Sequence, residues 1–161
     1  MPTLTASQED YLETIYRLEG QSAAIRVSDI AARLGTRLPT VTRTVKRLTR
    51  QRLLKHDHRQ EVSLSATGRR IAREIVHRHD DLVAFFRDFL GLGDKEAQEN
   101  ACRLEHGLSR KAAQRLHEFL EYWATLSQGE RKTIERFLDT ASKGHDEFKN
   151  ISPGKTAGWR S

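Results

Sequence analysis

The spacing of apolar residues changes twice along this chain, and those changes restrict the folds that it can adopt. Over residues 6–50, apolar side chains recur every three or four positions, which is the period of an amphipathic helix. Val62 and Leu64 then alternate with polar residues, as in a half-buried strand, and the helical period returns near residue 67. The order helix, helix, short turn, basic helix and β-hairpin predicts a winged helix-turn-helix.

Local signals divide the first of these regions into three helices. Residues 5–20 begin with a cap signal and end at a glycine, which predicts the first helix. Ser28 is a suitable N-cap for the second helix, which Gly35 ends. Pro39 fits the first turn of the third helix, where its missing N–H costs little. We expect the turn of the hairpin in the polar stretch HDHRQ.

The chain after the hairpin predicts helices only. One long helix is expected from Thr67 to about Leu90, because its apolar stripe is continuous and two glycines follow. Asp94 is expected to cap a fifth helix that ends near Gly107, and two further helices follow.

The predicted fold is therefore mainly α and has two domains. We expect a winged helix-turn-helix DNA-binding domain in residues 1–70 and an all-helical metal-binding and dimerisation domain in residues 71–142. Residues 143–161 turn polar and contain glycine and proline, which predicts a flexible tail.

Positive charge is concentrated in the first of these domains. Residues 1–70 carry 13 Lys and Arg against 7 Asp and Glu, whereas residues 71–161 carry 15 of each kind. A basic domain joined to a neutral one is typical of a nucleic-acid-binding domain with a second function attached. A solvated basic surface without a partner is the alternative interpretation.

Several classes of protein are not expected. No apolar run reaches the roughly 18–20 residues of a membrane span, and the N-terminus lacks the segments of a signal peptide. The single cysteine cannot form an internal disulfide, so we expect a cytoplasmic protein. No H-E-x-x-H or nucleophile motif occurs, so we expect no enzymatic activity and no organic substrate. Because no membrane span is predicted, we expect no membrane partner.

The third predicted helix would read DNA with its exposed face. The first turn of a recognition helix faces the bases of the major groove, while basic residues further along hold phosphates. Pro39 and Thr40 offer contacts to thymine methyl groups, and Arg43 can bridge guanine O6 and N7. Use of this module for protein contacts is the alternative. The predicted DNA-binding residues are Ser28, Arg37, Pro39, Thr40, Thr42, Arg43, Arg47, Arg50 and Arg59.

The short stretch ACRLEH places a thiol, a carboxylate and an imidazole close together. Cys102, Glu105 and His106 stand at i, i+3 and i+4, so they would project to one side of a helix. One ion could then bind all three, and these donors suit a first-row divalent ion rather than Ca²⁺ or Mg²⁺. The alternative is a packed helix, because a free cysteine is often a small buried hydrophobe.

Two more groups of candidate ligands lie on other predicted helices. Asp10 and Glu13 share one side of the first helix, and His77 and His79 lie midway along the long helix. The alternatives are first-turn carboxylates stabilised by the helix dipole, and surface histidines.

Six motifs, in order, resemble the diphtheria-toxin-repressor family of metal-activated repressors, which includes the manganese transport regulators. They are EDYLETIY, RVSDIAARLG, PTVTRTVKRL, LSATGRRIA, VHRHDDL and ACRLEHGLS, and the resemblance covers about residues 5–126. It implies a homodimer that binds a palindromic operator when Fe(II) or Mn(II) is plentiful and represses genes of metal uptake. By position, it implies metal ligands at Asp10, Glu13, His79, Cys102, Glu105 and His106.

Departures from the family pattern bear on the metal. Asp10 is a carboxylate, as in the manganese type, whereas Cys102 is a thiol, as in the iron type. Val83 and Gln98 stand where the iron type has ligands of an ancillary site, so that site is expected to be absent. The resemblance places the chain in the shorter branch, without an SH3-like domain. We expect Fe(II) or Mn(II), with a slight preference for iron, and binding of Zn(II), Co(II) or Ni(II) in vitro.

The implied ion would tie the first helix to the fourth and fifth helices. Without it, the like charges of the carboxylates would push the first helix away.

The long, fifth and sixth helices carry more apolar surface than one small lobe buries, which predicts a dimer interface, with an intramolecular core as the alternative. The predicted interface residues are Phe85, Phe86, Phe89, Leu116, Phe119, Leu120 and Trp123. A winged-helix regulator that senses an organic ligand, with a structural Cys/Glu/His cluster, is the alternative function.

Overall fold

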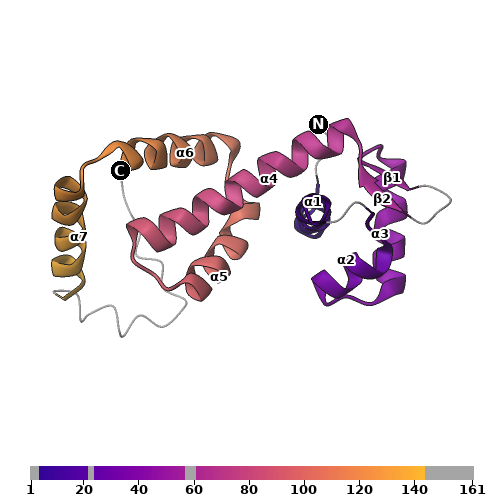
Figure 1. Cartoon of the computed structure of the whole chain (residues 1–161), viewed down its shortest axis with the longest axis horizontal. Coiled ribbons are helices and arrows are strands. Elements are labelled where there is room, and N and C mark those ends of the chain that lie inside the picture. Colours follow the sequence, from indigo (N-terminus) through magenta and orange to yellow (C-terminus); the bar gives the residue numbers. More distant parts are fainter. Residues whose placement is uncertain (1–3, 22–23, 57–60, 144–161) are drawn as a thin grey trace, which may run out of the picture.

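The computed structural model describes residues 4–21, 24–56 and 61–143. It forms an elongated molecule with a winged helix-turn-helix at one end and a helical domain at the other (Figure 1). The fold class predicted from the sequence is therefore confirmed. The first domain contains α1 (Ala6–Glu19), α2 (Val27–Leu34), α3 (Leu38–Arg50), β1 (Leu54–His56) and β2 (Val62–Leu64). The helix α4 (Ala66–Ala84) leads to η1 (Phe85–Phe89), α5 (Asp94–Leu104), η2 (Glu105–Gly107), α6 (Arg110–Thr125) and α7 (Gln128–Lys143).

The core of the DNA-binding end joins all of its elements to the first half of α4. Fully buried apolar side chains come from α1, α3 and the antiparallel pair β1 and β2, and Ala72 and Ile75 of α4 complete the same cluster. A second cluster joins Leu82 and Val83 of α4 to two alanines of α5. Because α4 runs without a break through both clusters, it fixes the two ends of the molecule relative to each other. The domain boundary at residue 70 remains a prediction.

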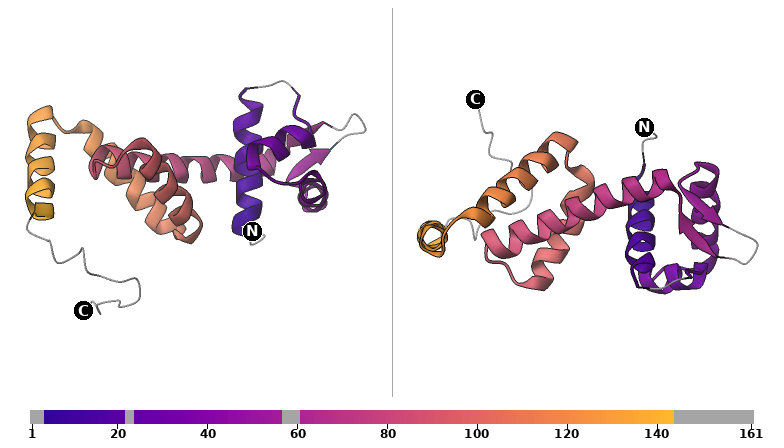
Figure 2. Two further views of the ribbon diagram at one scale, coloured as in Figure 1. Left: turned by 90° about the horizontal axis from the view of Figure 1, so that it is seen from below. Right: turned by 45° about the horizontal axis from the view of Figure 1, so that its top comes forward.

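The helix α1 crosses α4 and lies between the recognition module and the rest of the molecule (Figure 2). Its start is fixed by a capping box, in which the Thr5 hydroxyl accepts from the Gln8 N–H and the Gln8 side chain accepts from the Thr5 N–H. One side of α1 places Leu12 and Ile15 in the core of the first domain. Another side faces α4 and η2.

Two predicted caps are wrong. Arg26, not Ser28, precedes the first turn of α2, because Arg26 pairs with Glu61 in a β-bridge directly before the helix. The Asp29 carboxylate then accepts from the Arg26 N–H at 2.7 Å, which leaves Ser28 exposed inside the first turn. Gly93, not Asp94, is the N-cap of α5, so Asp94 lies in the first turn, where a carboxylate is favourable.

The predicted dimer residues gather on one side of α4–η1 and α6. The backbone widens into a π-helix at η1, and the Phe89 ring lies 5.0 Å from the rings of both Phe119 and Trp123, between centroids. Trp123 is buried, whereas the other six residues are only partly buried in the single chain. The dimer interface stays a prediction.

No helix in the described part of the chain is long and apolar enough to cross a membrane.

Gly68→Ala should destabilise the fold. An added Cβ would lie against the Leu53 carbonyl group, only 2.9 Å from its carbon, and the backbone there is held by a hydrogen bond from the Ser65 N–H to the Leu53 oxygen. Overpacking of this kind costs about 1–3 kcal/mol. The free energy of unfolding, measured with urea, should fall by that amount in Gly68→Ala. Gly129→Ala is the control, because a Cβ there meets nothing within 4 Å, and equal stability of both variants would contradict the packing.

Candidate metal centre and DNA interface

Among the described residues, two groups of three side chains could each hold a metal ion, and they share Glu105. The first group is Asp10, Glu105 and His106, and the second is Glu13, His79 and Glu105. Within each group the ligand atoms lie within 4.8 Å of one another. This spacing fits donors around one ion at metal–ligand distances of about 2.1 Å.

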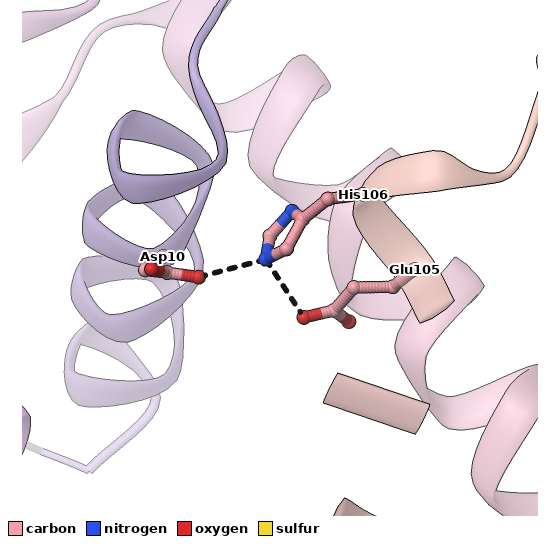
Figure 3. Close-up of side chains that lie close together, drawn as sticks. All are labelled: Asp10, Glu105 and His106. Carbon is pink, nitrogen blue, oxygen red and sulfur yellow. Dashed lines mark ion pairs between the residues drawn. The ribbon is translucent and has the colours of Figure 1, made fainter. Parts of the chain in front are cut away.

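Three elements bring these side chains together. Asp10 and Glu13 lie one helical turn apart on the side of α1 that faces η2, and His79 is buried on α4. Figure 3 shows Asp10 reaching across from α1 to His106. His106 Nε2 lies 3.0 Å from Asp10 Oδ1 and 3.4 Å from Glu105 Oε1.

The prediction that Cys102, Glu105 and His106 share one regular helix is wrong. The helix α5 ends at Leu104, and Glu105 and His106 belong to the 3₁₀ turn η2. Tightening of the last turn is common where a helix ends, and here it comes just before Gly107. The change of geometry turns Glu105 inward and leaves Cys102 exposed on α5, outside both ligand groups.

Glu105 is the most deeply buried ionisable group of the site, with 1% of its side chain exposed. Its Oε2 lies 2.8 Å from His79 Nδ1, while its Oε1 faces His106 Nε2. A buried carboxylate is costly unless it is paired, and each oxygen here faces an imidazole. The two oxygens point to different ligand groups, so Glu105 is placed to serve both.

The electrostatics favour protonated histidines. The hydrogen bond to Glu105 raises the pKa of His79 to about 9, against the opposing effect of burial. Gln98 contributes to this shift, because its Oε1 lies 2.9 Å from His79 Nε2. Burial lowers the pKa of His106, but the hydrogen bond to Glu9 and the charges of Glu105 and Asp10 raise it more, so the net pKa shift is upward.

The acidic groups are shifted in the direction that their crowding predicts. Burial raises the pKa of Asp10, and Glu105 and Glu9 add to the increase, while His106 opposes it. Burial also raises the pKa of the Cys102 thiol, with further contributions from Glu105, Asp10 and Glu13.

Two polar contacts of the site were missed by the sequence analysis. Glu9 contacts His106 Nδ1 at 2.9 Å, and Gln98 contacts His79, as described above. Glu9 is not singled out by the sequence analysis, and Gln98 is named there only as the replacement for an ancillary ligand. His77, which was weighed as a candidate, lies exposed on α4.

The donor set fits a first-row divalent ion. Carboxylate oxygens and imidazole nitrogens make up both groups, and such mixtures suit Mn(II), Fe(II) and Zn(II). A cavity of about 460 Å³ beside Glu13 and His79 gives access to the second group. The cavity is also lined by Arg17, which holds Glu13 Oε1 at 2.9 Å and Asp80 of α4 at 2.8 Å.

The predicted DNA-contacting residues of α3 lie opposite its buried face. Val41, Val45 and Leu48 point into the core. Pro39 and Arg43 line a shallow hollow on the outer surface, together with Leu38, Thr42 and Lys46. On α3 and at its N-cap, the predicted residues that are exposed are Arg37, Pro39, Thr40, Arg43, Arg47 and Arg50.

The other three predicted DNA-contacting residues, Thr42, Ser28 and Arg59, are not among these exposed residues of α3. Thr42 is partly buried and its hydroxyl donates to the Leu38 carbonyl at 2.9 Å, so that proton is already used within the helix. Ser28 is exposed on α2, beside Asp29. Arg59 lies outside the described residues.

Comparison with known proteins decides the family. A family model described as "Iron dependent repressor, N-terminal DNA binding domain" matches residues 3–62, and "Iron dependent repressor, metal binding and dimerisation domain" matches residues 65–133. The chain belongs to the iron-dependent repressor family. It is 30% identical over 139 residues to the HTH-type transcriptional regulator MntR of Geobacillus kaustophilus. The alignment covers 86% of this chain and 95% of that protein.

Other relatives of this family agree. An uncharacterized HTH-type transcriptional regulator of Methanocaldococcus jannaschii is 34% identical over 119 residues, covering 73% of this chain and 95% of that protein. A solved manganese-dependent transcriptional repressor in complex with manganese is 28% identical, with a TM-score of 0.66. The match covers 71% of this chain and 53% of that one, so the chain spans about half the length of that structure.

These matches confirm the resemblance drawn from the sequence motifs. The chain is a member of a family of metal-responsive transcriptional repressors. This result favours metal sensing over the sensing of an organic ligand.

The pairing of His79 with Glu105 predicts how stability and metal binding change with pH. Because the folded-state pKa of His79 is about 9 and its ordinary pKa is 6.5, the pairing stabilises the metal-free protein fully below about pH 6.5. This stabilisation should be lost as the pH rises towards 9. Since a ligating histidine must lose its proton, metal affinity should rise over the same range.

Melting temperatures of the metal-free protein and of Glu105→Gln, recorded from pH 6 to pH 9, would test this. The wild type should lose more stability than the variant over this range, because the variant lacks the carboxylate whose hydrogen bond and charge raise the pKa of His79. Equal pH dependence of the two proteins would contradict the assignment.

Proposed function

We propose that the protein is a homodimeric repressor that binds palindromic operator DNA in response to Fe(II) or Mn(II) and controls genes of metal uptake and homeostasis. The observation that carries this proposal is that ligand groups from both ends of the molecule converge on Glu105. Asp10 and Glu13 belong to the DNA-binding domain, whereas His79, Glu105 and His106 come from α4 and η2. Metal binding at this place is thereby linked to the position of α3.

The proposed metal ligands are Asp10, Glu13, His79, Cys102, Glu105 and His106. The geometry supports two neighbouring positions, one on each side of Glu105, in which each carboxylate oxygen serves one ion. Cys102 would join only if its side chain turned from the surface towards Glu105. It is therefore the least supported ligand of the set.

The donors support Mn(II) at least as well as Fe(II). Both ligand groups contain hard oxygens and imidazoles, and the Cys102 thiol, a soft donor, stands outside them. The slight preference for iron drawn from the sequence depended on that thiol. The likeness to a manganese-dependent repressor supports the same ion. Zn(II), Co(II) and Ni(II) would also bind in vitro.

The DNA response would follow from neutralising crowded carboxylates. Asp10, Glu13 and Glu105 repel one another, and an ion between them would hold α1 against η2. Since α1 shares its core with α3, this also fixes the recognition helix. In a dimer, the two α3 helices would then be held about one DNA turn, ~34 Å, apart. Metal and DNA would strengthen each other's binding equally.

We further propose that the partly buried aromatic side of η1 and α6 forms the dimer interface. Phe85 stacks on Phe89, and the Phe89 ring meets the rings of Phe119 and Trp123 edge to face, but the three phenylalanines remain partly open to solvent. A second copy would cover that surface, and Phe86, Leu116 and Leu120 extend it.

Asp10→Ala and His106→Ala should abolish metal-stimulated DNA binding and leave the fold intact. Each removes a donor of the first ligand group without opening the apolar core. Fluorescence anisotropy with a pool of random duplexes, with and without Mn(II) or Fe(II) under anaerobic conditions, measures the effect. Glu96→Ala is the control, because it removes an exposed carboxylate of α5 that lies outside both groups. If the wild type bound DNA equally well without metal, the proposed metal sensing would be contradicted, whereas the proposed DNA binding would stand.

Arg47→Ala and Arg43→Ala should weaken operator binding in different ways. Because Arg47 is expected to contact phosphate, Arg47→Ala should lower affinity for all sequences and reduce the slope of log K against log salt by about 0.9. Because Arg43 is expected to contact bases, Arg43→Ala should make the free energy of binding less favourable by about 1–3 kcal/mol on the preferred operator and by less on random DNA. Lys132→Ala, on the exposed surface of α7, is the control. Unchanged affinity in both arginine variants would remove α3 from the interface.

A further inference from the structure

Glu9 belongs to neither ligand group, yet it connects three segments around His106. One of its oxygens, Oε2, accepts from an Arg78 guanidinium N–H at 2.6 Å and lies 2.9 Å from His106 Nδ1. Glu9 lies on α1, Arg78 on α4 and His106 on η2. All three side chains are about one-fifth exposed, so solvent competes little for these contacts.

The contact with Glu9 determines which nitrogen of His106 is available. An ionised carboxylate can only accept hydrogen bonds, so the nitrogen that faces it, Nδ1, carries the proton. In the neutral ring the lone pair then belongs to Nε2. That nitrogen faces Asp10 Oδ1 at 3.0 Å and Glu105 Oε1 at 3.4 Å, where the first ligand group converges.

Arg78 makes this arrangement possible. Without a cation, the negative charge of Glu9 would add to those of Asp10 and Glu105, and the carboxylate would be drawn towards solvent. The guanidinium offsets that charge and holds the Glu9 oxygen where His106 Nδ1 meets it.

We propose that Glu9, anchored by Arg78, is a positioning residue that fixes the tautomer and orientation of His106 for metal binding. The inference rests on the proposed function, because it assumes that His106 binds the metal. Partners of this kind hold ligating histidines in place, and their loss lowers metal affinity about 10–100-fold.

The chain offers a matched control on the same helix. Glu19 of α1 also pairs with an arginine of α4, Arg69, at 2.7 Å, and it accepts from the Leu64 backbone N–H at 2.8 Å. Its contacts remain within the winged helix and reach neither ligand group. Loss of Glu19 should therefore lower stability without changing the state of His106.

The test combines two measurements on the full chain. Mn(II) affinity is measured by competition titration, and the tautomer of His106 is read from ¹⁵N chemical shifts of its ring, without metal, at a pH where the ring is neutral. We expect Glu9→Ala to lose 10–100-fold in affinity and the preference for a proton on Nδ1. Glu9→Gln, whose amide oxygen still accepts from Nδ1, should recover most of both. Glu19→Ala should change neither.

Glu9→Asp keeps the charge but withdraws the carboxylate by one methylene, so it should give intermediate values even if Glu9→Ala fails to fold. A wild-type tautomer and affinity in Glu9→Ala or Glu9→Asp would overturn the proposal. Equal losses of affinity in Glu9→Ala and Glu19→Ala, with the tautomer unchanged, would also overturn it. A wild type that binds no Mn(II) would contradict the proposed function instead, and the metal-free tautomer would still decide the role of Glu9.

Discussion

The pairing of the buried Glu105 carboxylate with His79 and His106 is the interaction on which the candidate metal centre depends. The carboxylate has no solvent to stabilise its charge, so it requires the imidazoles of His79 and His106 on either side. Those imidazoles are in turn held by Gln98 and Glu9. A cation bound between α1, α4 and η2 would therefore offset the negative charge of this buried carboxylate.

The helix α1 connects this chemistry to DNA recognition. Its apolar side is part of the core that also holds α3, and its acidic side carries Asp10 and Glu13. The pairs Arg17–Asp80 and Arg78–Glu9 join α1 to α4 on either side of these carboxylates. In the proposed mechanism, a change at Glu105 would reach α3 through this packed core.

Much of this fold could be predicted because its signals are local. The helical spacing of apolar residues predicted the helices, and the alternation of Val62 and Leu64 predicted the hairpin. The i, i+3 spacing of Asp10 and Glu13 predicted that both lie on one side of α1. The family resemblance, rather than spacing, linked these residues to Glu105 and His106. The 3₁₀ turn at Glu105 was not predicted, because the apolar spacing does not distinguish it from one more turn of α5.

The contacts that hold the ligands could not be predicted for a similar reason. Glu9 and His106 are separated by 97 residues, and nothing near Glu9 in the sequence distinguishes it from a solvated carboxylate. The cap at Arg26 depends on a bridge to Glu61 across the wing. Long-range contacts of this kind override local preferences.

Anomalous diffraction from crystals of the full chain grown with Mn(II) tests the central claim most directly. The account predicts manganese in contact with each carboxylate oxygen of Glu105, one ion towards Asp10 and His106 and the other towards Glu13 and His79. Manganese bound without contact to Glu105 would contradict it.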